Sequence, residues 1–450
     1  MRNKELITVY ITNYNYGKYI DKCIESVLLQ TYKHIEILII DDGSKDNSKK
    51  IIQKYAKNKK IKIVFQKNKG LITTNNIAVK LSNGKYIMRV DADDWLEKNA
   101  VEILYKEIKK DPKIAMVFSN YYEVNDYGKI ITEYRRHNFK KIKILDKPAH
   151  GACSLIDKSK ILLVGGYNEN LTCQDGYDIW FKFINKFKVK HISKSLFYYR
   201  QHEKSLSKDQ SKILLNRSKI LNSVSKKNKN FHTLGVMAIR GPVLDLYSNV
   251  FTKINKINLI DYTLKEILNS EINKIIIATP DENLKKYIKS NFKTKKIIFL
   301  KRNISSALFN TSIDDIILKC FSKFRHKNKK KYDAIMNIAI EAPFRKSFYF
   351  DSMISVMKIF KTDSVIAVKN ESDNFFKHTE SGLKIINDDK KLKLERNEIF
   401  RQVGKFYLIS KKLLSKGICL PKGNIGHIVL DNVASLSLEE YKFMTKFKKI

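Results

Sequence analysis

The chain has 450 residues, with 87 Lys plus Arg against 46 Asp plus Glu, which gives a net charge of +41. This length exceeds one ordinary domain and favours two. A hydrophobic fraction of 43% with 11% aromatic residues supports packed cores and excludes wholesale disorder. The excess charge is mostly lysine spread along the sequence, which indicates compositional bias. Two clusters, Lys57–Lys60 and Arg325–Lys331, additionally favour peripheral attraction to an anionic membrane surface.

The N-terminal segment and the cysteines favour a cytoplasmic protein. Met1 to Tyr10 enters a strand pattern without a basic region, an apolar stretch and a cleavage site, so no export signal is expected. No apolar run reaches the roughly 18 residues that a membrane-spanning helix needs. The five cysteines are odd in number, widely spaced and without a Cys-x-x-Cys pair. This spacing fits neither a disulfide framework nor a zinc site, and we expect reduced thiols.

Short apolar runs alternate with amphipathic segments in the first half. The alternation predicts strands and helices that build a mostly parallel, doubly wound α/β sheet. Strands are expected at Ile7–Thr12, Ile37–Asp41, Ile61–Gln66 and Tyr86–Asp91, and helices at Lys18–Leu29, Lys49–Ala56 and Leu71–Leu81. Such sheets bind ligands at the carboxyl ends of their strands, so the loops after Thr12, Ile40 and Val90 hold the candidate site.

The second half repeats this alternation after a polar stretch, Ser223–Asn230, that predicts a linker. We therefore expect a first domain over 1–222, a linker over 223–231 and a second doubly wound α/β domain over 232–450. Its expected strands are Leu234–Ile239, Lys274–Ala278, Ile297–Leu300, Asp333–Ile340 and Ser364–Val368, with helices such as Leu259–Leu268 and Phe350–Phe360.

Three motifs follow the strands of the first domain. Thr12–Gly17 offers aromatic and amide groups that can stack on a base and hydrogen-bond to it, and Asp41–Ser44 offers two carboxylates that accept hydrogen bonds from base and ribose donors. In Asp91-Ala-Asp93-Asp94, the first and third residues point the same way on extended backbone and form a hard-oxygen pair suited to Mg²⁺ or Mn²⁺. Alternatively, these acids cap a helical element over Trp95–Ile108.

Together these motifs resemble the family 2 glycosyltransferases with a GT-A fold, over almost the whole first half. The resemblance rests on Val9–Asn15, Ser26–Tyr32, Glu36–Ser44, Asn68–Gly70 with Asn76, Asn83–Ile87 before the Asp-x-Asp, and Gly165–Tyr167. Thr12 departs from the family, which usually has proline there. The resemblance implies an inverting, metal-dependent transfer of sugar from a nucleotide-sugar donor to a hydroxyl of a glycan or lipid-linked acceptor, in surface polysaccharide or glycoconjugate assembly.

The same resemblance implies roles for individual residues. It assigns the donor nucleotide to Asn13, Tyr14, Asp41, Asp42, Asn76 and Asp91, and the divalent metal ion, Mn²⁺ or Mg²⁺, to Asp91 and Asp93. The family's general base precedes a helix, and the matching segment here is Cys173–Trp180, in which Gly176 displaces the usual acidic pair. Asp175 is the expected base and Asp178 its rival. For either acid, a helix N-terminal residue favoured by the dipole is the alternative.

The segment Tyr198–Ser207 is similar to a closing segment of the family. Within it, Arg200 is expected to meet a phosphate and His202 to complete the metal shell, although a lone histidine is more often a surface or packing residue. His150 is expected on the acceptor side without an assigned role.

The second half is similar to the cytidylyltransferases that make CMP-activated acidic sugars. The similarity rests on Arg240-Gly241, Leu259–Leu264, Ala342–Arg345 and Phe400–Gly404. Family glycine, serine and lysine positions hold Pro242, Val243, Leu244 and Asn249, and Ser435-Leu-Ser437 replaces an Asp-x-Asp. These losses predict a degenerate domain that serves binding, positioning or assembly.

Three other functions remain as alternatives. The second domain can be an active CMP-sugar synthetase, which would make the protein bifunctional, or the whole chain can be a non-catalytic sugar-nucleotide-binding scaffold. Nucleic-acid binding rests on charge alone, without an aromatic and basic recognition motif, and no specific nucleic acid is expected as a partner.

Overall fold

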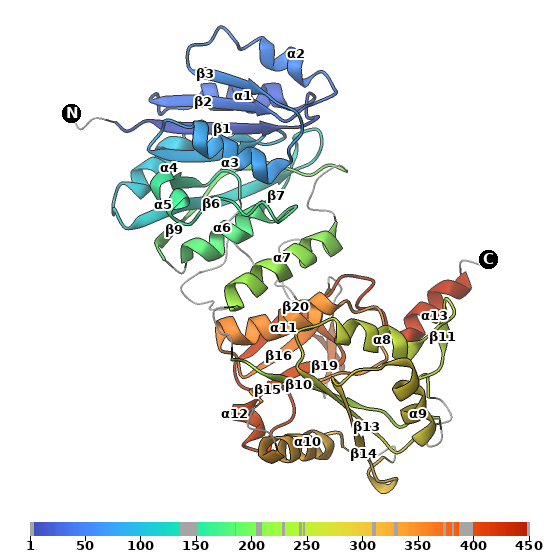
Figure 1. Ribbon diagram of the computed structural model, residues 1–450. Helices are drawn as coiled ribbons and strands as arrows, with labels where there is room; N and C mark the ends of the chain where they lie inside the picture. The colour runs from blue at the N-terminus through green and yellow to red at the C-terminus, as the bar shows by residue number, and fades with distance from the viewer. Residues whose placement is uncertain are drawn as a thin grey trace. The chain divides into compact units, whose positions relative to one another are not determined.

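The computed structural model describes residues 4–135, 151–184, 186–203, 209–226, 230–242, 245, 248–307, 312–327, 332–371, 375–379, 382–386 and 399–447. The chain divides into two compact units, Met1–Ile220 and Leu221–Ile450 (Figure 1). No helix within these described ranges is long and apolar enough to cross a membrane.

One half of the unit 1 sheet is parallel, as the sequence predicts. Its strands lie in the order β3-β2-β1-β4. They are β1 (Ile7–Asn13), β2 (Ile35–Asp41), β3 (Ile61–Phe65) and β4 (Tyr86–Asp91), and the helices between them are α1 (Ile20–Leu28), α2 (Ser48–Gln53) and α3 (Leu71–Leu81). The isoleucine-rich strands are buried, as expected for strands covered on both faces.

The other half of this sheet contains antiparallel pairs, so the sheet is mixed and the expectation of a mostly parallel sheet is wrong. Beside β4 the order continues β8-β6-β9-β5, with β7 paired to β6. The strands are β5 (Trp95–Leu96), β6 (Ile114–Val124), β7 (Ile130–Tyr134), β8 (Leu155–Asp157) and β9 (Lys188–Arg200). The short strand β8 runs antiparallel to both β4 and β6, so it is a single reversed strand between neighbours that share one direction.

The helical element expected over Trp95–Ile108 is divided. Its start forms β5, and the helix α4 (Ala100–Ile108) begins only after its N-cap residue Asn99. Asp91, Asp93 and Asp94 therefore do not cap this helix. Unit 1 also contains α5 (Lys158–Leu163), α6 (Asp175–Ile184) and most of α7 (Gln210–Ser225).

Helix α7 extends into the segment expected to be a linker. Ile220 and Leu221 are buried, and within unit 2 the Asn222 and Ser225 side chains hydrogen-bond to Ser355. The polar composition at 223–225 therefore reflects hydrogen bonding at the end of helix α7, because these residues belong to that helix.

Unit 2 also holds a mixed sheet, in the order β14-β13-β10-β15-β19-β16-β20, whose first four strands are parallel. The strands are β10 (Thr233–Ala238), β13 (Lys274–Thr279), β14 (Ile297–Lys301), β15 (Ala334–Asn337), β16 (Ser364–Glu371), β19 (Ile399–Ser410) and β20 (Ile425–Val429). Two small pairs, β11 (Lys253–Ile254) with β12 (Ile257–Asn258) and β17 (Phe376–Thr379) with β18 (Gly382–Ile385), stand apart.

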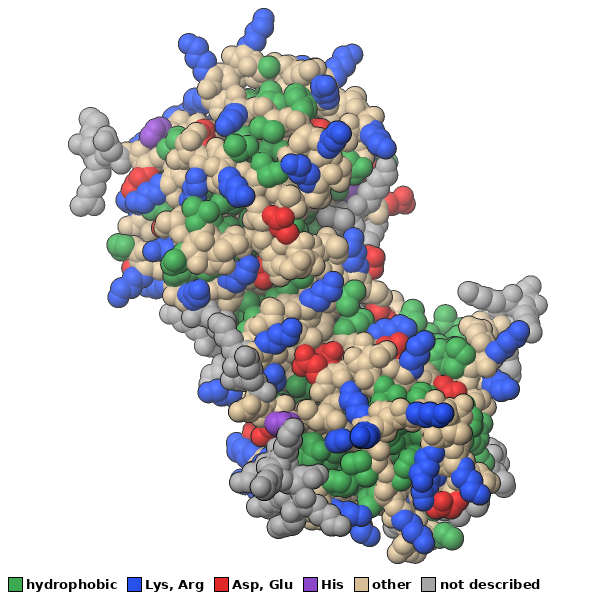
Figure 2. Space-filling view, in the orientation of Figure 1, with side chains coloured by type: hydrophobic (Ala, Val, Ile, Leu, Met, Phe, Trp, Pro, Cys, Tyr) green, Lys and Arg blue, Asp and Glu red, His purple; other side chains and the backbone are tan. Residues whose placement is uncertain are grey.

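The helices of unit 2 are α8 (Leu259–Leu268), α9 (Glu282–Asn291), α10 (Asp314–Lys327), α11 (Ser347–Phe360), α12 (Lys411–Leu414) and α13 (Leu438–Phe447). Figure 2 shows lysine and arginine side chains scattered over the visible face of each unit rather than gathered in one patch. The side chains of the basic cluster at 325–331 lie outside the described part of the chain.

Candidate functional site

The strand ends of unit 1 bring the three motifs of the first domain together. In the parallel register Asn13 pairs with Asp41, and Thr12 pairs with Asp91. A cavity of about 510 Å³ opens at this edge. It is lined by Thr12, Asn13, Tyr14, Asn15, Tyr16, Asp42, Asn68, Gly70, Leu71, Thr74, Asp91, Asp93, Thr172 and Tyr199. The structure thus gathers five of the expected site residues, Asn13, Tyr14, Asp42, Asp91 and Asp93, around one cavity.

Asp41 organises this edge from behind. Its carboxylate accepts a hydrogen bond from Asn13 Nδ2 at 2.7 Å and from the Ser44 backbone N–H at 2.9 Å. The Asn13 side chain is thereby fixed, and its Oδ1 is buried and accepts no hydrogen bond from the described residues. Asp41 is not among the residues that line the cavity. It holds Asn13 in place, with an amide oxygen available to a ligand donor.

Asp42 shapes the cavity wall. Its carboxylate accepts hydrogen bonds from Gln66 Nε2 at 2.7 Å and from the backbone N–H groups of Lys69 and Gly70, each at 2.8 Å. Gly70 has φ +85, a left-handed conformation that favours glycine. The carboxylate therefore fixes the loop that carries Asn68 and Gly70 into the cavity.

Three acidic side chains crowd the end of β4. Burial raises the pKa of Asp91 to about 6, with Asp93 and Asp175 adding to the rise, although Arg89 opposes it. Burial, followed by the charges of Asp93 and Asp91, raises the pKa of Asp94 well above its usual range. Like charges held this close are stabilised by a cation.

The donor set fits a divalent cation. Asp91 and Asp93 are hard oxygen donors that line the cavity, and Asp91 Oδ1 accepts no hydrogen bond from the described residues although Arg89 Nε lies 2.9 Å from it. In the described ranges, no three or more His, Cys, Asp or Glu side chains form a ready metal-binding group. Mg²⁺ commonly takes only one or two protein carboxylates and completes its shell with substrate phosphates and water.

His202 and Arg200 lie beside these acids. His202 is buried, its Nε2 lies 2.9 Å from Asp93 Oδ2, and its ring stacks on Tyr19 and meets Tyr16 edge-on. The histidine therefore adjoins one expected metal ligand, and its own expected ligand role stays a prediction.

Arg200 uses its donors on the protein itself. Its Nε donates to the Asp93 backbone oxygen at 2.9 Å and its Nη1 to that of Asp126 at 2.6 Å, and its guanidinium lies against the rings of Tyr19 and Trp95. It is buried and not among the cavity-lining residues. In this arrangement Arg200 fixes the loops around the acids, and the phosphate contact expected for it stays a prediction.

The candidate bases begin helix α6. Asp175 is its first residue and is buried, and its carboxylate contacts Arg89 Nη1 and accepts a hydrogen bond from Asn75 Nδ2 at 3.1 Å. Asp178 is also buried and forms an ion pair with Lys182 of the same helix at 2.7 Å. Asp175 thus faces the strand that carries Asp91, while Asp178 has a partner one helical turn away. Neither acid is among the residues that line the cavity, and the role of Asp175 as the base stays a prediction.

Asn76 binds the glycine turn rather than the cavity. Its amide donates to the Tyr167 backbone oxygen at 3.0 Å and accepts from the Tyr167 N–H at 2.9 Å. A Cβ atom on Gly166 would come within 2.7 Å of Asn76 Oδ1, which explains glycine there. The nucleotide contact expected for Asn76 stays a prediction.

Sequence reasoning did not single out several cavity residues, namely Leu71, Thr74, Thr172 and Tyr199. Tyr16 lies in the segment Thr12–Gly17, whose aromatic groups the sequence did indicate. His150 and residues 204–207 of the closing segment lie outside the described part of the chain.

Comparison with known proteins places this site in a family. The family model "Glycosyl transferase family 2" matches residues 8–161, within unit 1. An uncharacterised glycosyltransferase of Methanocaldococcus jannaschii is 33% identical over 208 residues, which cover 44% of this chain and 71% of that protein. The chain belongs to glycosyl transferase family 2.

Relatives involved in polysaccharide synthesis match the chain over less of their own length. The chondroitin synthase of Escherichia coli is 32% identical over 209 residues, which cover 46% of this chain and 30% of that enzyme. This chain therefore spans less than a third of that relative. Among solved structures, S. aureus TarS 1-349 in complex with UDP-GlcNAc superposes with a TM-score of 0.43 and 16% identity, covering 50% of this chain and 67% of that one.

Proposed function

We propose that unit 1 is an inverting glycosyltransferase that moves a sugar from a nucleotide-sugar donor to an acceptor hydroxyl, with its domain over 1–222. The observation that supports it best is the cavity at the strand ends, where Asp91 and Asp93 stand beside the fixed amide of Asn13. Family membership supplies the reaction class, and the chain's own residues supply the roles below.

The donor nucleotide is assigned to the half of the cavity formed by Asn13, Tyr14 and Asp42. Asn13 Oδ1 is a buried acceptor for a base or ribose donor, and Tyr14 is 43% exposed at the cavity, where its ring can stack on a base. Asp41 acts through Asn13, because its carboxylate holds that amide.

The diphosphate is assigned to the acidic end. Asp91 and Asp93 would hold Mn²⁺ or Mg²⁺, with His202 adjoining Asp93. When bound, such a cation supplies Lewis-acid stabilisation of the negative charge that develops on the departing nucleoside diphosphate. Asp94 and Arg200 keep this loop in shape, since Asp94 Oδ1 accepts the Arg200 N–H at 2.9 Å.

Asp175 is the proposed general base. It would take the proton of the acceptor hydroxyl as that oxygen attacks the sugar carbon on the face opposite the departing diphosphate. Its place at the start of α6 and its contacts with Arg89 and Asn75 hold the carboxylate in one position. We assign the acceptor to a glycan or lipid-linked glycan in polysaccharide or glycoconjugate assembly at the cytoplasmic membrane face. Similarity to the chondroitin synthase supports the glycan class.

A thermal-shift screen tests the donor assignment. UDP-, GDP-, dTDP- and CMP-sugars with Mn²⁺ are added to the full chain and to the Asn13→Ala variant. A donor at about 100 times its Kd stabilises the folded state by roughly 2.7 kcal/mol, so a matching nucleotide raises the melting temperature of the wild type. We expect Asn13→Ala to lose most of this shift. A shift of equal size in both proteins would contradict the assignment.

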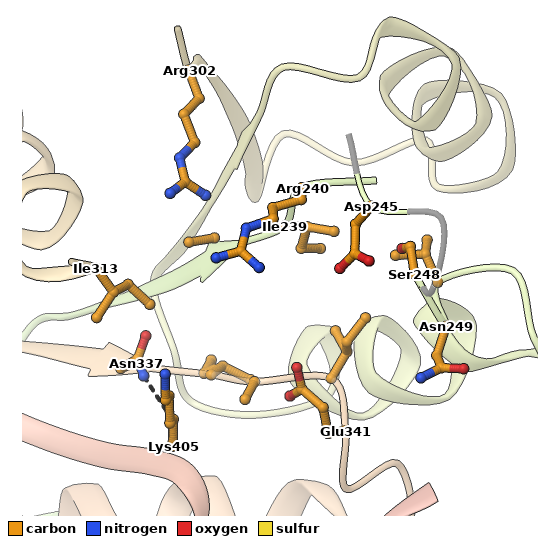
Figure 3. Close-up of a pocket in the computed structure, with 15 residues that line it drawn as sticks. Ile239, Arg240, Asp245, Ser248, Asn249, Arg302, Ile313, Asn337, Glu341 and Lys405 are labelled. Atoms are coloured by element: carbon orange, nitrogen blue, oxygen red, sulfur yellow. Dashed lines mark hydrogen bonds between the residues drawn. The ribbon is translucent and has the colours of Figure 1, made fainter. Parts of the chain in front are cut away.

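We further propose that unit 2 contains a nucleotidyltransferase-like domain, over 232–450, that binds a ligand without turning it over. A cavity of about 260 Å³ lies at the carboxyl ends of β10 and β15. Figure 3 shows Arg240 and Arg302 on one side of it and Asp245 and Glu341 on the other. The floor includes Asn337, a buried side chain whose Oδ1 accepts no hydrogen bond from the described residues.

We propose that unit 2 lacks transfer chemistry because four residues, in two segments, differ from those of the similar family. Ser435 and Ser437 stand where the similar family has its metal-binding acids, and Pro242 and Asn249 replace residues of its phosphate loop, while Val243 and Leu244 lie outside the described residues. Incubation with CTP and acidic sugars tests this assignment. We expect CTP or CMP to raise the melting temperature of the full chain without release of pyrophosphate. Pyrophosphate release would instead establish the active synthetase.

A further inference from the structure

Arg89 lies between two functional carboxylates of unit 1. It is on β4, two residues before the end of the strand, and its side chain is 5% exposed. Its Nε lies 2.9 Å from Asp91 Oδ1 and its Nη2 3.3 Å from Asp91 Oδ2. Its Nη1 contacts Asp175 Oδ2. One guanidinium therefore joins an acid of the donor end to the proposed base.

Arginine is the side chain that can make this double contact. Its planar fork presents donors in several directions and stays charged inside the protein, whereas the ammonium of lysine is a single point. Arginine stays protonated inside proteins, so the guanidinium is a permanent cation between the two carboxylates.

The surroundings leave this group little freedom. A Cβ atom on Gly151 would lie 3.1 Å from Arg89 Nη2 and 3.1 Å from the Cα of Gly176, so the start of α6 packs tightly against the loop at 151. The Arg89 backbone oxygen accepts the Cys153 N–H at 2.6 Å from that same loop. Gly176 displaces the family's acidic pair. It lies where the start of α6 approaches the loop at 151, and this close approach also fixes Arg89.

The contacts also distinguish the two oxygens of Asp175. Arg89 and Asn75 both contact Oδ2, and neither of them uses Oδ1. Because one oxygen is held by two donors, the carboxylate cannot rotate freely, and Oδ1 is the oxygen that can face an acceptor hydroxyl. A base fixed in this way meets the geometric demand of proton transfer, which is hydrogen-bond reach to the proton taken.

We propose that Arg89 is a positioning residue for the transfer reaction, which sets Asp175 at a fixed place relative to Asp91 so that the base and the donor end are aligned through one guanidinium. This role rests on the proposed function of unit 1. During transfer Arg89 keeps its proton, Asp175 Oδ1 accepts the hydroxyl proton, the acceptor oxygen bonds to the sugar carbon, and the bond to the nucleoside diphosphate breaks.

A double-mutant cycle on the full chain tests this role. The proteins are the wild type, Arg89→Gln, Arg89→Lys, Asp175→Asn and the double variant Arg89→Gln/Asp175→Asn. Each is assayed for nucleoside diphosphate release with the donor that stabilises the wild type. Arg217→Gln is the matched control, because Arg217 Nε holds Gln174, next to Asp175, and not the proposed base itself.

We expect Arg89→Gln to lower kcat about 100-fold, the size of loss that misplacement of a catalytic group by about 1 Å causes, with the donor KM within about 3-fold of the wild type. Arg89→Lys keeps the charge but not the fork and should recover part of kcat. In the Asp175→Asn background, Arg89→Gln should cost less than about 3-fold, because residues that act as a unit are not additive.

Other outcomes overturn the role. If the losses in kcat from Arg89→Gln and Asp175→Asn multiply fully in the double variant, or if Arg89→Gln changes KM alone, Arg89 serves stability or donor binding. If Arg89→Gln does not fold, Arg89→Lys decides by itself: wild-type kcat in that variant refutes the role, whereas a lowered kcat with unchanged KM supports it. A wild-type chain that releases no nucleoside diphosphate with any donor refutes the proposed function and this role with it, while equal turnover in the wild type and Arg89→Gln refutes only the role.

Discussion

The ligand edges of the two units share a strand order and differ in charge. In unit 1 the parallel strands run β3-β2-β1-β4, and in unit 2 they run β14-β13-β10-β15. Each unit has a cavity at the carboxyl end of its central strands. Its charged lining residues are the acids Asp42, Asp91 and Asp93 in unit 1, whereas unit 2 combines Arg240, Arg302 and Lys405 with Asp245 and Glu341. The strand order determines where a ligand binds, and the residues just past each strand determine the charge that the cavity presents to that ligand.

This difference separates two ways of binding a phosphate. An acidic edge needs a cation between itself and the diphosphate, and that cation can also stabilise a departing group. An edge that carries arginines can bind the anion directly, without a cation between them. The two edges therefore predict catalysis in unit 1 and binding in unit 2, and four measurements test this difference.

The largest effect is expected from Asp93→Asn. Loss of one carboxylate from the acidic edge removes charge at the point where the cation stabilises the leaving group, so kcat/KM should fall about 1000-fold or more. Release of nucleoside diphosphate measures it. The control is Asp111→Asn, which removes an equal charge from a surface pair with Lys188 and should change little. Retention of activity in Asp93→Asn would contradict the prediction that the acidic edge of unit 1 is catalytic.

The next effect distinguishes the two acids of α6. Asp175→Asn should lower kcat by about 10² to 10⁴, the usual contribution of a general base. Asp178→Asn removes only a partner of Lys182 on the same helix and should cost less than about 10-fold in kcat. Steady-state kinetics of both variants measures the difference. The reverse order would move the base one helical turn along α6.

The acidic edge of unit 1 could be predicted from the sequence because its information is local. Asn13, Asp42, Asp91 and Asp93 each follow a strand that the apolar pattern identifies, and parallel strands place their carboxyl ends at one edge. The start of α6 at Asp175 was predicted from the family resemblance, in which the general base precedes a helix.

The remaining features depend on contacts between distant segments. Arg89 has an ordinary place in a strand, and its function becomes visible only when β4 and the start of α6 meet 86 residues apart in sequence. The antiparallel pairs of the sheet were missed for the same reason, because β8 has only three residues and its direction is set by its neighbours. Asp41 and Asn76 are of residue types that often bind ligands, yet Asp41 holds Asn13 and Asn76 holds Tyr167.

The third measurement concerns the cationic edge of unit 2. Arg302 is buried, and burial, together with the nearby charge of Arg240, lowers its pKa. An anion between these side chains would relieve that repulsion, so Arg302→Gln should weaken binding of CTP or CMP about 10-fold, the loss of one charge-assisted hydrogen bond. Calorimetric titration measures it. Arg401→Gln, which removes an exposed partner of Glu371, is the control and should bind as the wild type does.

The smallest effect concerns a buried acid of unit 2 that lies outside its cavity. Asp351 is on α11, and its carboxylate accepts the Glu271 backbone N–H at 2.7 Å. Burial raises the pKa of Asp351 to about 6, with the Glu271 charge contributing. The folded state therefore binds this proton more tightly than the unfolded state does. Stability is lost as pH rises from about 4 to about 6, and the loss stays constant above that range.

Asp351→Asn should remove this loss and keep the hydrogen bond to Glu271. The free energy of unfolding should rise by about 1 to 2 kcal/mol at pH 7.5 and by nothing at pH 4, since a shift of one pKa unit corresponds to about 1.4 kcal/mol and the partly exposed site is screened. Denaturant unfolding at the two pH values measures it. An equal gain at both would attribute the effect to packing. A pH-dependent gain in the free energy of unfolding, without altered CTP binding, would show that the Asp351 charge destabilises the fold. Unlike the acids of unit 1, it would then have no part in ligand binding.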